Sequence, residues 1–211
     1  MRGAGGGGGG ADPQPSFTEL VDSNLSVAAD ISKDLGTLAV GPPTLASTFG
    51  NVQAGVTAFD LLGVPVTDTR GFLNFPLSSI PLAASIRFAS VTVFMNSVTL
   101  RTPSLPSPFF VDLIDTVTFP TPIVSSDYSA AWAATRSVNF LNSDQGRFVE
   151  NDVTSLMREA QRLSLPSFEI RIAFNEEAFL ANPSTTRGWV EIDDQFAVPG
   201  QRPLLTVDYV I

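Results

Sequence analysis

Carboxylates are the groups left for acid–base chemistry in this 211-residue chain, because it contains no His and no Cys. That composition excludes Ser-His-Asp and Cys-His arrangements, thiolate zinc sites and disulfides. A glycosidase needs two carboxyl groups about 5–10 Å apart across a cleft, and the candidate pairs are Glu176-Glu177 and Asp193-Asp194. Adjacent acidic residues on a loop usually carry only solvated charge. We therefore predict that the chain is not an enzyme.

Amphipathic aromatic rings form the second group of interest, since a flat ring can stack on the apolar face of a sugar while its polar tip makes a hydrogen bond. Besides Tyr209, which falls on the buried phase of the last predicted strand, the chain offers Tyr128, Trp132 and Trp189. Tyr128 and Trp132 share a Ser- and Ala-rich stretch, residues 125–134, whereas Trp189 begins a strand. We predict all three as ligand-binding residues and favour the first two. The alternative is a loop that its aromatic rings fold over the core.

Acidic residues near a predicted loop suggest a third kind of site. Glu191, Asp193 and Asp194 lie close together in sequence, and calcium prefers several oxygen ligands. No EF-hand spacing is present. A structural calcium ion held by these three residues is therefore a hypothesis, and no other cofactor is indicated.

The charge balance limits the partners. The net charge is −9 and Lys33 is the single lysine, whereas a nucleic-acid-binding surface needs a basic footprint. We predict no nucleic-acid partner. The sequence also shows no transmembrane segment, because Gly, Pro, Ser and Thr interrupt its longest uncharged stretch, residues 35–59.

A glycine-rich start precedes the folded part. Residues 1–16 predict a flexible tether, and residues 17–211 predict a single domain. A glycine-rich stretch usually follows the lipid-bearing cysteine of a bacterial lipoprotein, so a lipid anchor upstream of this tether is a further hypothesis.

Alternation of apolar and polar residues predicts most of the secondary structure as strands. The clearest case is residues 168–174, where Phe168 and Ile170 share a face with Ile172 while Glu169 and Arg171 point the other way. The same period marks the strands around residues 73–77 and 205–209. Further strands are expected at residues 17–27, 52–59, 86–100, 109–117, 137–141 and 189–192.

Two local features interrupt this pattern. The apolar phase shifts after Ile86, which predicts a β-bulge near Arg87 and Phe88. Residues 152–163 instead repeat their apolar side chains with helical spacing and predict a short amphipathic helix, with Asn151 or Asp152 as its N-cap. Strands without regular βαβ alternation favour an all-β, antiparallel two-sheet β-sandwich with one short helix.

Four segments in order carry a family resemblance. RGFLNFPLSSIP at residues 70–81, SIRFASVTVF at 85–94, DVTSL at 152–156 and RPLLTVDY at 202–209 resemble the corresponding segments of DNRLRE-type domains. Those domains are jelly rolls grouped with carbohydrate-binding modules, and the same strand pair occurs in the propeptide fold of transforming growth factor-β precursors. The chain departs from the family at Pro76, where Asp is common, and at Asp193-Asp194-Gln195, where the family often has an SRE triplet.

The resemblance implies an accessory or surface domain of bacterial or archaeal proteins. We accordingly expect a non-catalytic extracellular or cell-surface module that binds polysaccharide. The alternative is a structural or assembly subunit, or a spacer, of a surface or secreted complex, with another surface protein as its partner.

Overall fold

The computed structural model describes residues 15–22, 29–34, 44–46, 51–59, 65–100, 107–115, 123–174, 188–193 and 200–211. Most of the predicted tether therefore lies outside the described residues. The described part contains strands, one α-helix and two 3-10 helices. In chain order they are β1 (Ser16–Asp22), β2 (Ala29–Asp34), β3 (Thr44–Ala46), β4 (Asn51–Phe59), β5 (Pro65–Pro76), β6 (Ser85–Leu100), β7 (Ser107–Ile114), η1 (Ser125–Ser129), β8 (Trp132–Phe140), η2 (Asn142–Asp144), β9 (Arg147–Asp152), α1 (Thr154–Arg162), β10 (Ser167–Phe174), β11 (Gly188–Asp193) and β12 (Leu204–Val210).

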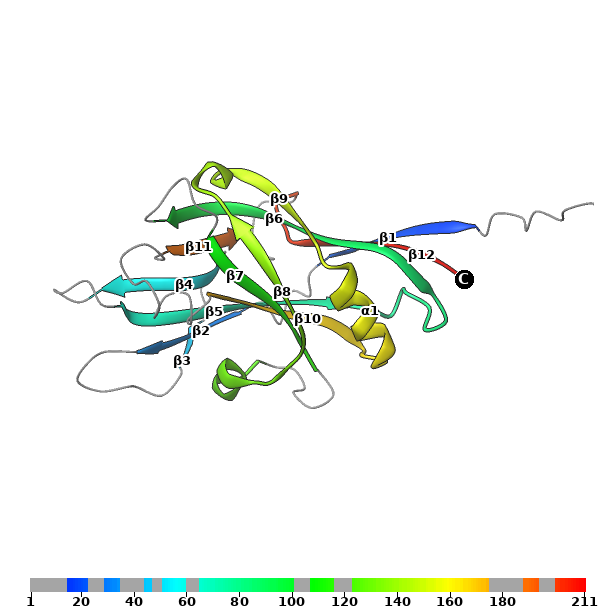
Figure 1. The fold of residues 1–211 in the computed structure, drawn as a ribbon, viewed down its shortest axis with the longest axis horizontal. Helices are drawn as coiled ribbons and strands as arrows, with labels where there is room; N and C mark the ends of the chain where they lie inside the picture. Colours follow the sequence, from blue (N-terminus) through cyan, green and yellow to red (C-terminus); the bar gives the residue numbers. More distant parts are fainter. Residues whose placement is uncertain are drawn as a thin grey trace, which may run out of the picture.

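All strands join one antiparallel sheet, in the order β1-β12-β6-β11-β4-β5-β10-β7-β8. Three strands lie off this path: β2 pairs with β5, β3 with β2, and β9 with β6. The sheet curls strongly, as the twist of adjacent strands allows, and α1 lies at the right-hand part of the view in Figure 1. The prediction of an antiparallel, mostly β fold with one short helix is thus confirmed, and the ladders form one continuous sheet.

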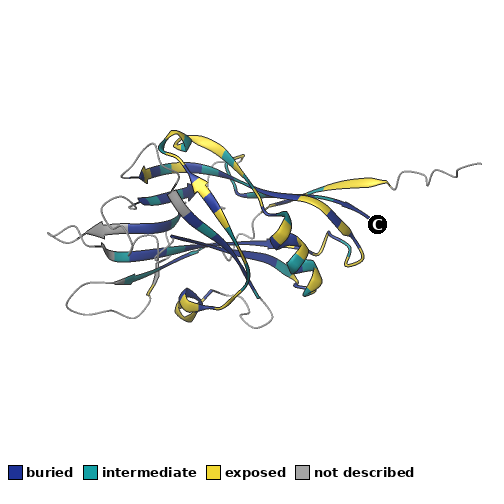
Figure 2. Ribbon diagram, in the orientation of Figure 1, coloured by how far each residue is buried: buried dark blue, intermediate teal, exposed yellow. Residues whose placement is uncertain are grey.

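The inside of the curl holds the main hydrophobic core. Phe75 and Phe168, which face each other across paired strands β5 and β10, are fully buried there with Leu205 of β12. Their alternate positions match the predicted strand phase. Buried residues of these strands are drawn in dark blue in Figure 2.

The predicted bulge is confirmed. Strands β6 and β12 pair Phe88 with Asp208 and then Ile86 with Tyr209, so Arg87 has no partner in this ladder. One extra residue shifts the phase of β6, which keeps Ile86 in the core on one side of the bulge and Ala89 on the other.

The predicted helix is also confirmed, but its N-cap is shifted. The cap position is Val153, while the Asp152 carboxylate accepts hydrogen bonds from the Thr154 backbone N–H (2.9 Å) and hydroxyl (2.6 Å). These bonds and the Arg136 cation lower the pKa of Asp152. Asp152 still ends β9, so the chain turns one residue later than the cap preference alone indicates. As predicted, the apolar face of the helix packs on the core through Leu156 and the residues beside it.

Other boundaries differ from the sequence predictions. Short strands β2 and β3 and strand β9 were not predicted, and residues 125–134, taken as a loop, contain η1 and the start of β8. The N-terminal strand ends at Asp22, and the rest of its predicted range, residues 23–27, lies outside the described residues. No helix in the described ranges has the length and apolar character needed to cross a membrane.

Gly71 provides a test of the close contact between β4 and β5. A Cβ at this position would lie 2.5 Å from Val52 Cγ1 and 2.9 Å from the Gln53 carbonyl oxygen. We expect Gly71→Ala to lower the midpoint of urea unfolding, because the backbone of β4 must move. Gly146→Ala is the control, since it meets no atom within 4 Å and only its φ of 71° opposes the substitution, at about 1–2 kcal/mol. A Gly71→Ala midpoint at or above that of Gly146→Ala would contradict the packing.

Candidate functional site

The face of the sheet turned away from the main core, here called the outer face, is covered at β10. Glu169 and Arg171 point to this face as predicted, but each is only 1% exposed. A strand covered on only one face would leave both side chains in water. They are buried because residues 123–130, here called the anchored segment, lie over them as part of a second, smaller apolar cluster that includes Tyr128.

Arg171 connects the sheet to the anchored segment. Its Nε and Nη2 donate to one oxygen of Asp112 on the neighbouring strand β7 (3.1 and 2.8 Å). Its Nη1 donates to the backbone oxygens of Tyr128 (3.1 Å) and Ala130 (2.9 Å). Burial lowers the pKa of Arg171, and Asp112 opposes that shift. The guanidinium remains charged, because arginine in water loses its proton only above about pH 12.

A second arginine repeats this connection from β5. Arg70 Nη1 donates to the Tyr128 backbone oxygen (2.6 Å), and its guanidinium carbon lies 4.0 Å from the centre of the Tyr128 ring. The Tyr128 hydroxyl donates to Asp68 (2.5 Å), which also pairs with Arg70. Tyr128 is therefore held on its ring face, its hydroxyl and its backbone oxygen. Lys33 of β2 adds a cation 5.5 Å from the ring centre.

Glu169 is a buried carboxyl group on this face with a perturbed pKa. Burial, followed by the nearby charge of Asp127, raises its pKa to about 7, although a hydrogen bond from Asn74 (3.0 Å) opposes the shift. Asp127 belongs to the anchored segment, where its carboxylate accepts a hydrogen bond from the Val124 backbone N–H (2.8 Å). The site thus brings two acidic groups together under a covering segment.

The two favoured aromatic residues have different surroundings. Tyr128 is 3% exposed and points inward, so its ring is not presented to solvent. Trp132 begins β8 and is 57% exposed, with the Arg171 guanidinium 5.8 Å from its ring centre. Of the pair, only Trp132 offers a ring that a ligand can reach.

Trp132 stands at the head of a series of polar side chains. Pairing with β7 places Trp132 opposite Ile114, Thr135 opposite Asp112 and Ser137 opposite Phe110. These β7 residues alternate with core residues, so the β8 side chains lie on the outer face. Thr135, Ser137 and Asn139 are all exposed. We call Trp132, Thr135, Ser137 and Asn139 the polar row; among the described strands, β8 forms an edge of the sheet.

The remaining predicted residues lie on β11. Trp189 is half-buried and paired with Gly55, and Glu191 accepts a hydrogen bond from Asn51 (2.7 Å). Asp193 is 8% exposed, and Asp194 lies outside the described residues. Within the ranges the structure describes, no group of three metal-ligating side chains occurs. Calcium binding at Glu191, Asp193 and Asp194 stays a prediction.

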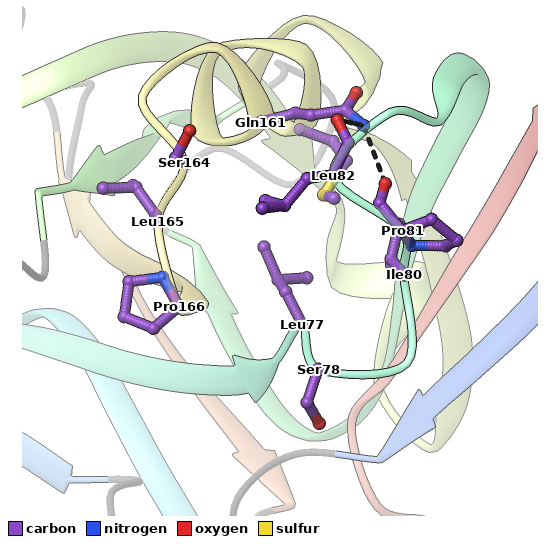
Figure 3. A pocket seen from close by; sticks show the side chains of 10 residues that line it. Leu77, Ser78, Ile80, Pro81, Leu82, Gln161, Ser164, Leu165 and Pro166 are labelled. Carbon is purple, nitrogen blue, oxygen red and sulfur yellow. Dashed lines mark hydrogen bonds between the residues drawn. The ribbon is translucent and has the colours of Figure 1, made fainter. Parts of the chain in front are cut away.

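A pocket of about 380 Å³ lies between the end of α1 and the turn that follows β5 (Figure 3). Gln161 fixes this turn by donating to the backbone oxygens of Pro81 and Leu82, both at 3.3 Å. The lining residues are Leu77, Ser78, Ile80, Pro81, Leu82, Met157, Gln161, Ser164, Leu165 and Pro166. None of these is aromatic, so the pocket offers no flat ring on which a sugar can stack. We place the candidate site on β8.

Comparison with known proteins gives no assignment: no protein-family model matches the chain, and no curated protein sequence matches it either.

The contacts of Arg171 generate a stability prediction. Arg171→Met removes the donors of two backbone oxygens and leaves Asp112 buried without its cation. Breaking a buried pair in this way costs about 3–5 kcal/mol, so we expect the urea midpoint to fall sharply. Arg162→Met is the matched control, because its pair with Glu159 is exposed. Equal midpoints for the two variants would show that the buried network does not stabilise the fold.

Proposed function

We propose that the chain is a non-catalytic extracellular or cell-surface β domain that binds polysaccharide along the polar row of β8. The exposed Trp132 ring, at the head of that row, is the observation that supports this function most directly. An indole face stacks on the apolar face of a pyranose ring, and the hydroxyl and amide groups of Thr135, Ser137 and Asn139 hydrogen-bond sugar hydroxyls. Along a strand these four residues span roughly 24 Å, at about 3.4 Å per residue.

A non-catalytic role is favoured by the state of the acidic groups. Glu169 and Asp127 resemble a pair that could share acid and base roles, but both are at least 95% buried under the anchored segment. Asp68 and Asp112 are held by Arg70 and Arg171. The net charge of −9 disfavours a nucleic-acid partner.

The family resemblance supplies the finer expectations. In this proposal the two halves of the curled sheet act as the facing layers of a jelly-roll sandwich, with Phe109 of β7 and Val207 of β12 contributing to one core. A surface location in a bacterium or archaeon follows from the same resemblance, and the proposed lipid anchor upstream of the tether follows from the glycine-rich stretch.

Trp132→Ala tests the binding site. We expect retention on immobilised polysaccharides to weaken at least tenfold, because truncating a central aromatic contact costs about 2 kcal/mol or more. Phe148→Ala is the control: Phe148 is 55% exposed, close to the value of Trp132, but lies on β9. Equal retention by Trp132→Ala and the unaltered chain, across polysaccharides that the chain does retain, would reject the site. A panel with no retained polysaccharide would reject the function.

An assembly role is the second candidate, and strand β1 favours it. This strand is an edge of the sheet in the described structure, its ladder with β12 has no bulge, and Phe17 and Leu20 are 42% and 62% exposed. An edge strand with exposed apolar side chains and without a bulge or lysine can pair with a strand of another chain. Light scattering tests this role. Assembly would be supported if the molecular mass rises with protein concentration and if Leu20→Lys returns it to the monomer value. A constant monomer mass would argue against it.

A further inference from the structure

The anchored segment carries one buried carboxyl group, Asp127, close enough to a second buried carboxyl group, Glu169 of β10, for their charges to interact. We infer that residues 123–130 form a proton-controlled latch, closed over β10 while Glu169 is protonated and loosened when Glu169 ionises beside Asp127. Its role in ligand binding rests on the proposed function, because Trp132 follows the latch directly in the chain. The latch itself is a property of the free protein.

The geometry explains why this carboxyl group acts on this segment. Glu169 is fixed on β10, in the middle of the sheet, and Asp127 is carried by η1. Both are buried, so water hardly screens the repulsion between them when Glu169 becomes negatively charged. The sheet side of the pair cannot move without breaking β10 from β5 and β7, whereas the η1 side is attached to the sheet by side-chain contacts, chiefly those of Arg70, Arg171 and Tyr128. Repulsion therefore acts on the segment.

Other charged side chains on this face determine whether the ionised form of Glu169 has a partner of opposite charge. Arg171 lies two residues along β10, Arg70 and Asp68 come from β5, Asp112 from β7 and Lys33 from β2. The arginines already pair with Asp112, Asp68 and the two backbone oxygens of the segment. The neutral donor Asn74 is the hydrogen-bond partner of Glu169. Among the described residues, no cation therefore neutralises Glu169 directly when it loses its proton.

The sign and size of the effect follow from the pKa. A carboxyl group whose pKa is raised in the closed state favours that state at low pH, and the gain is lost as pH rises through about 7. If opening restores the ordinary pKa of 4.5, the opening equilibrium constant rises about thirtyfold between about pH 5.5 and about pH 8.5, since each pKa unit is a tenfold change.

Hydrogen exchange measures this opening without a ligand. The reporters are the backbone amides of Val124, Asp127 and Ala130, which all donate hydrogen bonds within the segment. After correction for intrinsic exchange, we expect their protection to fall about thirtyfold over this pH range while core amides of β6 change less. Local measurement is needed because Asp30, whose pKa burial raises to about 6, also makes global stability fall as pH rises.

Three variants isolate the carboxyl pair. Glu169→Gln should abolish the pH dependence, and Asp127→Asn should reduce it by less, because burial is the larger cause of the raised pKa of Glu169. The amide introduced by Asp127→Asn still offers an oxygen to the Val124 N–H. Asp144→Asn is the matched control, because Asp144 in η2 accepts the equivalent bond from Leu141 N–H (2.7 Å) but is only half-buried. It should keep the full pH dependence. If either latch variant retains the wild-type dependence, or if core amides change as much as the segment, the latch is wrong.

Retention of polysaccharide is measured separately at the same pH values. A pH-dependent segment in a protein that retains no polysaccharide would reject the proposed function and keep the latch. If polysaccharide is retained through Trp132 but hydrogen exchange in the segment does not change with pH, the proposed function is kept and the latch is rejected.

Discussion

The buried guanidinium of Arg171 is the interaction on which the outer face of this sheet depends. A cation removed from water must be surrounded by acceptors, and here Asp112 supplies one side while the backbone oxygens of Tyr128 and Ala130 supply the other. The two backbone oxygens are available only if the chain after Ile123 folds back over β10. One charged side chain thus fixes the path of a segment more than 40 residues away in sequence.

Covering β10 on both faces also changes how the fold is stabilised. The chain has no cysteine, so stability comes from packing rather than from disulfides. The inner face provides the main core, and Phe72, Ile31 and Tyr128 build a second cluster on the outer face. The strand β10 also carries Arg171 and Glu169, whose burial would be costly without partners. Arg171 is bonded to Asp112 and the anchored segment, and Glu169 to Asn74. The outer cluster and the polar network therefore depend on each other.

The sequence predicts the parts of this fold that local patterns determine. The two-residue period gives β10 and β12, the phase shift gives the bulge at Arg87, and helical spacing gives α1. The polar network could not be predicted, because a two-residue period assigns Glu169 and Arg171 to one face of the strand but does not show whether that face is exposed to solvent. Its contacts depend on the register of β10 against β7, which pairs Arg171 with Asp112 across 59 residues. Strand β2 could not be predicted because its apolar face holds only Ala29 and Ile31, and Lys33 takes the next position of that face.

The same limit explains the different surroundings of Tyr128 and Trp132. Both are aromatic residues in a small-residue stretch, and only the tertiary contacts distinguish them. Tyr128 lies where Asp68 accepts its hydroxyl and Arg70 covers its ring, so it acts as an anchor. Trp132 lies where the chain re-enters the sheet opposite Ile114, with a cation beneath one part of its ring and solvent on the other. An exposed ring fixed by strand pairing loses little freedom when a flat ligand stacks on it, which favours binding. The anchor and the exposed ring are therefore complementary parts of one arrangement, since the buried tyrosine holds in place the backbone that presents the tryptophan.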